Sequence, residues 1–228
     1  NINENLSINA DSAGGLNLSG STITLGDGTT LNFTNSTGTV SISSTLAGTG
    51  SLSKTGAGAM TLFGSNTYEG TTTISAGTLN VASDNNIGSG ALTLTGGSTL
   101  SVTGATTIDN SIVLAGNATV KLNTQAATLS GVISGSGNLT SAAGKTKLTL
   151  LGNNTYTGAT LVSGGTLVVG HNNALGDTAG STTVASGTSL ELSDGLIVAE
   201  NVTIAGSGVP GTAAFLVRSG AAATHTGT

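Results

Sequence analysis

The sequence predicts an all-β fold, a right-handed parallel β-helix (β-solenoid) of about ten turns. Three observations predict this fold: short apolar strands with a period of two, a duplicated unit along the chain, and a composition rich in glycine and small polar residues but poor in aromatic residues. Aromatic residues make up 2% of the 228 residues, Trp is absent, and Gly occurs 37 times.

Alternating apolar residues mark the strands. Leu92 and Leu94, or Ile112 and Leu114, are separated by one residue, and turn residues (Gly, Asn, Asp and Ser) follow each such pair. No stretch has the i, i+3, i+4, i+7 apolar spacing of a surface helix. We therefore expect strands and little or no α-helix.

A long unit occurs twice. Residues 64–81 match residues 152–169 without a gap, at an offset of 152 − 64 = 88. Upstream, Gly48-Thr-Gly50-Ser-Leu52 matches Gly135-Ser-Gly137-Asn-Leu139 at 135 − 48 = 87. We interpret residues 1–228 as a single β-solenoid fragment with repeat units at about 48–134 and 135–228, the second incomplete. Residues 1–47 are the end of a preceding unit or N-terminal turns.

The duplication also leads to an expectation about geometry. At roughly 22 residues per turn, 88 residues are four turns, so equivalent residues should lie on the same face. Leu79 and Leu167 begin alternating apolar strands and should point inward, whereas Thr166 should point outward. A β-sandwich is the alternative, but it usually carries buried aromatic anchors such as Trp.

Composition also excludes several classes of protein. Charged residues make up 7%, the formal net charge is −5, and the five basic residues are too few for a phosphate-tracking groove, so we expect no nucleic-acid partner. No apolar run approaches the roughly 20 residues of a transmembrane helix. Cysteine is absent, so packing and hydrogen bonds must stabilise the fold. The chain begins at Asn1 without Met or a signal peptide, and we expect a mature or excised piece.

The duplicated motif resembles a known repeat. Asn66-Thr-Tyr68-x-Gly70 with Gly77-Thr-Leu79, and Asn154-Thr-Tyr156-x-Gly158 with Gly165-Thr-Leu167, resemble the passenger-associated transport repeat (autotransporter-associated β-strand repeat) of autotransporter passenger domains. The resemblance covers about 48–81 and 135–169. The first copy carries Lys54 in its upstream half, where the second copy has Ser141, and Lys145 follows four residues later.

The residues that we single out belong to this motif, and we assign them a structural role in the repeat. They are Gly64, Asn66, Tyr68, Gly70, Gly77 and Leu79 in the first copy, and Gly152, Asn154, Tyr156, Gly158, Gly165 and Leu167 in the second. We predict no catalytic, cofactor-binding or metal-binding residues and no cofactor. The ten acidic residues, with Glu191 and Asp194 as the tightest local pair, are interpreted as solvated turn residues, as is His171; His225 has no partner nearby in sequence. Replacing Glu191, Asp194 or His171 by Ala should therefore cost little stability.

The resemblance implies a non-enzymatic structural and interaction segment of a secreted bacterial surface protein, a passenger stalk that supports export and adhesion. It implies type V secretion, display beyond the outer membrane, and an outer-membrane translocator barrel in the full-length protein. Partners would be a host-cell or matrix receptor, surface glycans or another cell-surface protein. Two alternatives on the same scaffold are a polysaccharide lyase or hydrolase, which needs converging carboxylates, and a carbohydrate-binding face, which needs a flat ladder of Thr or Asn.

Overall fold

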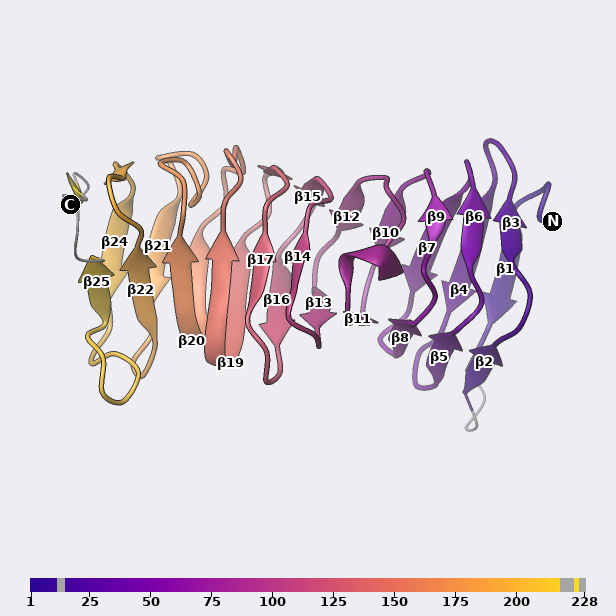
Figure 1. The fold of residues 1–228 in the computed structure, drawn as a ribbon, viewed down its shortest axis with the longest axis horizontal. Helices are drawn as coiled ribbons and strands as arrows, with labels where there is room; N and C mark the ends of the chain where they lie inside the picture. Colours follow the sequence, from indigo (N-terminus) through magenta and orange to yellow (C-terminus); the bar gives the residue numbers. More distant parts are fainter. Residues whose placement is uncertain (12–14, 218–223, 226–228) are drawn as a thin grey trace.

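The computed structural model describes residues 1–11, 15–217 and 224–225 of the chain. These residues form a rod of about ten stacked turns, and every pairing between the described strands is parallel. In Figure 1 the chain advances from the N-terminus at the right to the C-terminus at the left, strands on the near side rise, and strands on the far side descend. This is a right-handed coil, so the predicted right-handed parallel β-helix is confirmed.

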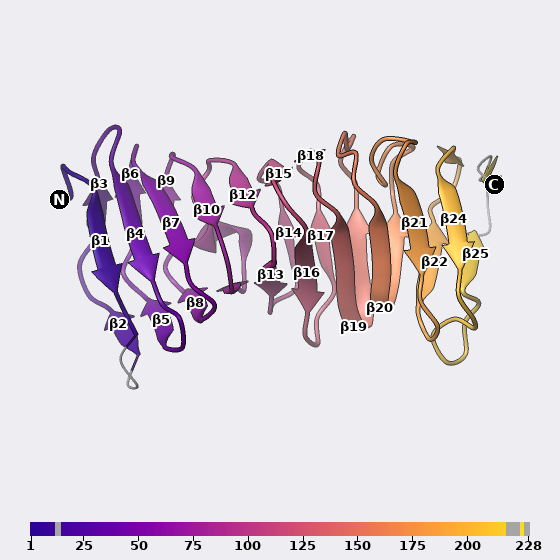
Figure 2. The same cartoon turned by 180° about the vertical axis from the view of Figure 1, so that it is seen from behind.

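The first side of the rod is a seven-stranded parallel sheet, which faces the viewer in Figure 2. Its strands, in spatial order, are β1 (Leu6–Asn9), β4 (Thr30–Thr34), β7 (Ser51–Thr55), β10 (Thr72–Ile74), β12 (Leu92–Leu94), β15 (Ile112–Leu114) and β18 (Ile133–Gly135).

The second side follows the first in each turn and extends over the whole rod. Its strands are β2 (Leu16–Leu18), β5 (Thr39–Ile42), β8 (Ala59–Leu62), β11 (Thr78–Val81), β13 (Ser98–Val102), β16 (Ala118–Leu122), the first parts of β19 (Leu139–Leu150) and β20 (Thr160–Val169), β21 (Ser181–Val184) and β24 (Asn201–Ile204).

The third side is less regular. In the N-terminal half it holds β3 (Ile23–Leu25), β6 (Leu46–Gly48) and β9 (Thr67–Tyr68), and in the C-terminal half it holds β14 (Thr106–Ile108), β17 (Ala127–Leu129), the last parts of β19 and β20, β22 (Ser189–Leu192) and β25 (Phe215–Val217). β23 (Ile197–Val198) pairs with β26 (Thr224–His225). Because β19 and β20 turn the edge without a break, they join the second and third sides into one 14-stranded sheet.

The interior is one continuous apolar core that runs along the rod. Inward side chains stack from turn to turn because the strands are in register: Met60 pairs with Leu79, and Leu79 pairs with Leu100. The one helical element among the described residues is a single 3₁₀ turn, η1 (Asp84–Asn86). No helix of the described part is long and apolar enough to cross a membrane.

The length of a turn differs from the expected value of roughly 22 residues. On the first side, Leu52 pairs with Thr72, Thr72 with Leu92, Leu92 with Ile112, and Ile112 with Ile133. Four turns therefore take 133 − 52 = 81 residues. The remaining 88 − 81 = 7 residues are about one side of a turn.

The expectation that equivalent residues share a face is therefore wrong. Leu79 lies on the second side in β11, whereas Leu167 pairs with Leu148 and Leu190 on the third side. Each copy of the repeat is rotated by one side of the rod relative to the other. The three sides are similar in length, so a unit moved by one side meets similar neighbours.

The outward direction predicted for Thr166 does not make this residue solvent-exposed. Leu79 and Leu167 are fully buried, but Thr166 is only 8% exposed and Val168, two residues later, is 4% exposed. Thr166 stacks between Lys147 and Ser189 of the adjacent turns, and Val168 stacks on Glu191. Period two gives the direction of a side chain, but it does not show what covers the outer surface.

Candidate functional site

The most distinctive sites of the molecule are the two edges of the rod at which the repeat motif lies. At the first edge, Asn66 accepts a hydrogen bond through Oδ1 from the Leu46 amide (2.7 Å) and donates through Nδ2 to the Asn86 carbonyl (2.6 Å). These partners belong to the turn before and the turn after. One buried side chain therefore ties three consecutive turns together.

The second copy repeats this geometry at another edge. Asn154 accepts from the Ile133 amide (2.8 Å) and donates to the Ala174 carbonyl (2.6 Å). It is 3% exposed, so both of its bonds are shielded from water. A buried main-chain group without a partner costs about 1–3 kcal/mol, and the asparagine satisfies one such group on each neighbouring turn.

Each copy also buries its tyrosine completely. The Tyr68 hydroxyl lies 2.5 Å from Thr72 Oγ1, and the Tyr156 hydroxyl lies 2.6 Å from Thr160 Oγ1. Burial raises the pKa of both phenols above the usual value, and the threonine hydrogen bond partly opposes that rise. The rings fill the interior at the edge, so they cannot stack on a ligand outside.

Glycines allow the turns to approach each other at these edges. A Cβ atom on Gly70 would lie 2.2 Å from the Gly50 carbonyl oxygen, and one on Gly158 would lie 2.2 Å from that of Gly137. Gly64 and Gly152 are equally restricted, by carbonyl oxygens at 2.4 and 2.3 Å. Gly77 and Gly165 have positive φ, +72° and +63°, where other residues are strained.

Lys54 is fully buried inside the first copy, which the sequence motif alone did not indicate. On β7 it lies between Phe33 and Ile74 of the adjacent turns, and its Nζ donates to the carbonyls of Gly56 (2.8 Å) and Ala76 (3.1 Å). Burial lowers the pKa of this ammonium from 10.5 to about 8. Ser141, the equivalent residue, is also fully buried, and its hydroxyl has no hydrogen-bond partner.

Sequence reasoning also missed three buried asparagines, Asn35, Asn86 and Asn110. Asn35 Nδ2 donates to the Ala59 carbonyl of the next turn (2.9 Å). Asn86 Nδ2 donates to the Gly64 carbonyl (3.1 Å), and Asn110 Nδ2 donates to the carbonyls of Gly88 (2.7 Å) and Gly90 (2.9 Å). These side chains bond to one neighbouring turn, whereas those of Asn66 and Asn154 bond to the turns on both sides. The available signal was an Asn in the short connection between two strands, which many solvated turn residues share.

A shallow hollow lies beside each tyrosine edge. The first has a volume of about 370 Å³, and its lining includes Glu69, Asp84 and Asp109; the second, of about 350 Å³, includes Asn153, Asn173 and Asp177. Within the described ranges, no group of three or more His, Cys, Asp and Glu residues is arranged to hold a metal ion.

Two of the acidic residues are not solvated, contrary to prediction. Glu191 is 6% exposed, and its Oε2 accepts a bond from Lys147 Nζ at 2.6 Å. Glu200 is 3% exposed and accepts a bond from Thr182 Oγ1 (2.8 Å); burial raises the pKa of its carboxyl to about 7. The partner of Glu191 lies two turns away and that of Glu200 lies one turn away. Sequence spacing does not reveal either contact. The expectation that Glu191→Ala is neutral therefore no longer follows.

The other predicted surface residues behave more simply. Asp194 is exposed in the turn that precedes β23, as expected. His171 is half-buried rather than fully exposed, and its Nδ1 accepts a bond from the Asn173 amide (3.1 Å) in the same turn. His225 lies in β26. The resemblance of residues 222–227 to residues 126–131 falls mostly outside the described residues.

Comparison with known proteins agrees with the geometry of the edges. The family described as passenger-associated-transport-repeat matches twice, at residues 52–81 and 142–169. The first match contains Lys54, Asn66 and Tyr68, and the second contains Asn154 and Tyr156, whose side chains form the edges described above. No curated protein and no solved structure matches the chain significantly. Such repeats indicate a structural domain rather than an enzyme. The chain is therefore a β-solenoid with two passenger-associated transport repeats, consistent with an autotransporter passenger domain.

Proposed function

We propose that this chain is a stalk segment of a secreted bacterial surface protein, in which folding of the rod supports export and the finished rod carries an adhesive surface. The alternatives of a lyase or hydrolase have no support from converging carboxylates among the described residues. The repeats support the stalk, and so does the absence of cysteine. Without cysteine the chain cannot form disulfides, which would obstruct passage through a narrow translocator.

The observation that carries the proposal is the bond from each motif asparagine to the turns on both sides. Asn66 can make both of its bonds only when the turns that contain Leu46 and Asn86 are in place. Each new turn is therefore held by the previous one as soon as it forms. Stability is then nearly a sum of neighbour terms, as in other solenoids.

This arrangement suits a chain that emerges from a channel one end first. Every turn that folds outside removes apolar surface from water and cannot easily return through a narrow pore. Folding energy released turn by turn would then oppose backward movement of the chain.

Export can be tested with the full chain placed between a signal peptide and an outer-membrane translocator. Surface exposure, measured by protease access on intact cells, should fall for Asn154→Ala. Asn153→Ala is the matched control, because that neighbour is exposed and makes its side-chain bond to Asn173 at the surface. Equal display of the two variants, with Asn154→Ala shown to be less stable in solution, would contradict a role of folding in export.

A further inference from the structure

A groove lies at the edge between the second and third sides, in the C-terminal half of the rod. Its volume is about 510 Å³, within the range of about 300–1,000 Å³ that is usual for small-molecule sites. Its lining comes from four successive turns and includes Lys145, Gly165, Ser186, Gly187, Val209 and Pro210. At about 4.8 Å between turns, the groove follows the rod axis for about 14 Å.

One wall of the groove is an enlarged loop. At this edge, β21 connects to β22 through residues 185–188, whereas one turn later β24 connects to β25 through residues 205–214. The solenoid closes its turn with the shorter connection, so the longer loop is not required by the fold. Insertions in repeat proteins often form the binding face.

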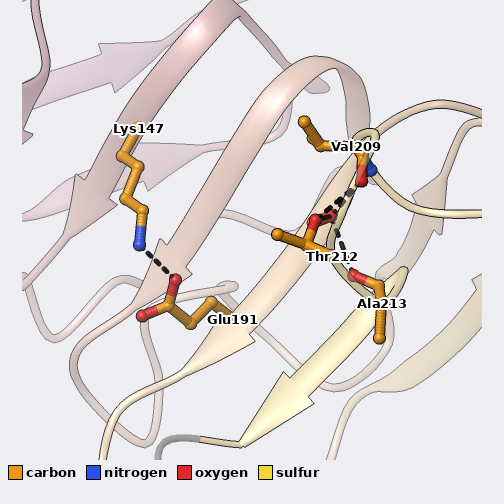
Figure 3. A network of polar contacts seen from close by, with 6 residues as sticks. Lys147, Glu191, Val209, Thr212 and Ala213 are labelled. Carbon is orange, nitrogen blue, oxygen red and sulfur yellow. Dashed lines mark hydrogen bonds and ion pairs between the residues drawn. The ribbon is translucent and has the colours of Figure 1, made fainter.

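The enlarged loop is held in place by hydrogen bonds. The Val209 amide donates to Ser189 Oγ (3.1 Å), and Ser189 Oγ donates to the Ala213 carbonyl (2.9 Å). Thr212 Oγ1 donates to the Val209 carbonyl (2.9 Å) in the same network, which Figure 3 shows. Pro210 is the one proline of the chain, and its ring fixes φ. A wall ordered in advance lowers the entropic cost of binding.

The floor of the groove is bare main chain. A Cβ atom on Gly187 would meet no atom within 4 Å, so a side chain there would extend into the open groove. Gly144, Gly165 and Gly187 all have positive φ, which explains glycine at each position. Gly187 faces the open groove, whereas a Cβ atom on Gly165 would lie 2.5 Å from the Thr146 carbonyl oxygen of the adjacent turn. A ligand can therefore approach the backbone and the hydroxyl of Ser186.

The charge of the groove is opposite to that of the chain. The sequence has ten acidic and five basic residues, yet the one charged residue of the lining is the exposed Lys145. The neighbouring Lys147 is bound to Glu191, as Figure 3 shows, so its charge is balanced.

We propose that this groove binds a short carboxylate-bearing (uronic acid) oligosaccharide, which would be the ligand class for the adhesive role proposed above and rests on that role. Lys145 would pair with a carboxylate, Ser186 and exposed main-chain groups would bond to hydroxyls, and Val209 with Pro210 would contact the apolar face of a sugar ring. An extended peptide fits less well, since β20 and β22 are already paired on both sides and offer no free strand edge.

The test is calorimetric titration of the full chain with oligogalacturonate, and with a neutral oligosaccharide of the same length. Binding of the acidic ligand should weaken as salt is added. Lys145→Ala and Pro210→Asp should each weaken it about tenfold or more. Lys121→Ala, which changes an exposed lysine outside the lining, should change it much less.

Equal binding of the acidic and neutral ligands would overturn the proposal, as would unchanged binding by Lys145→Ala and Pro210→Asp, or no binding by the unaltered chain. Export of the same variants by the fusion described above separates this inference from the stalk. Normal display with no glycan binding would overturn only the groove. Equal display of Asn154→Ala and Asn153→Ala would instead count against the stalk.

Discussion

The first repeat copy buries a lysine where the second buries a serine, at 141 − 54 = 87. Lys54 reaches from the first side to the carbonyls of the edge that follows it. At this edge the strand is interrupted, since β7 ends at Thr55 and β8 begins at Ala59. Ser141 is too short to reach such carbonyls, and β19 continues round the edge without a break. The same repeat is therefore closed in two ways, one by a buried ammonium and one by a continuous strand.

The rotation of the copies adds to this comparison. The motif keeps its own asparagine, tyrosine and glycine geometry on whichever side of the rod it falls. What the repeat conserves is therefore a local edge between three turns, not a face that is presented in one direction. A partner that recognised both copies in the same way would have to reach two different sides.

The largest effect should come from the inward leucines. Leu79→Ala and Leu167→Ala should each lower the free energy of unfolding by about 2–5 kcal/mol, because each removes a fully buried side chain and leaves a cavity. Leu161→Ala is the matched control: it lies on the same strand as Leu167 but is 38% exposed. Denaturant unfolding and hydrogen exchange would measure both.

Two outcomes would change the comparison. If Leu79→Ala and Leu167→Ala differ by several kcal/mol, the second and third sides are not equivalent environments for the repeat. If Leu161→Ala costs as much as Leu167→Ala, the inside and outside assignment of β20 is wrong.

The tyrosine hydroxyls should give the next largest effect. Tyr68→Phe and Tyr156→Phe should each cost about 1–3 kcal/mol, since the hydroxyl of Thr72 or Thr160 would remain buried without its bond. Thermal unfolding of both variants tests whether the two edges contribute equally. A neutral result in one copy would indicate that its threonine finds another partner there.

Some features of the rod could be predicted from the sequence, and others could not. Period two and the Gly-Asn turns were sufficient for parallel strands and for inward Leu79 and Leu167. They were insufficient for the length of a turn, because the pairing of Leu52 with Thr72 is a contact between segments that share no local pattern. Without that length, the rotation of the copies could not be inferred.

The same limit applies to the buried polar groups. Lys54 and Glu191 are charged residues in strands of mixed composition, and only the adjacent turns decide whether they are covered. The motif residues Asn66 and Asn154 were located by the duplication, but their bonds to both neighbouring turns were not. Those bonds depend on which turn lies above and below.

An effect of similar size should come from pH between about 8 and 10, where Lys54 of the first copy loses its proton in the folded chain. The folded pKa of Lys54, about 8, lies below its ordinary value of 10.5, so the unfolded chain holds this proton more tightly. Stability should therefore rise as the pH increases from about 8 to 10, and this gain is absent below pH 8. Above pH 10 the raised pKa of the two buried tyrosines acts in the opposite direction. Lys54→Met should remove the dependence, whereas Lys121→Met should keep it. Thermal unfolding monitored by circular dichroism across this range would measure it. A flat profile for the unaltered chain would mean that water reaches the ammonium.

The smallest effect, and the one of opposite sign, concerns Ser141. Its hydroxyl is buried between Val120 and Val162 of the adjacent turns and has no hydrogen-bond partner. The free energy of removing this hydroxyl from water is therefore not offset by a hydrogen bond. Ser141→Ala should therefore stabilise the rod by up to about 1 kcal/mol. Ser163→Ala is the paired variant: Ser163 Oγ donates to the Ser141 carbonyl (3.1 Å), so its loss should destabilise slightly. Urea unfolding of the two variants should give changes of opposite sign. If Ser141→Ala is destabilising instead, a buried water bonds to this hydroxyl, and the second copy, like the first, satisfies its inward polar group.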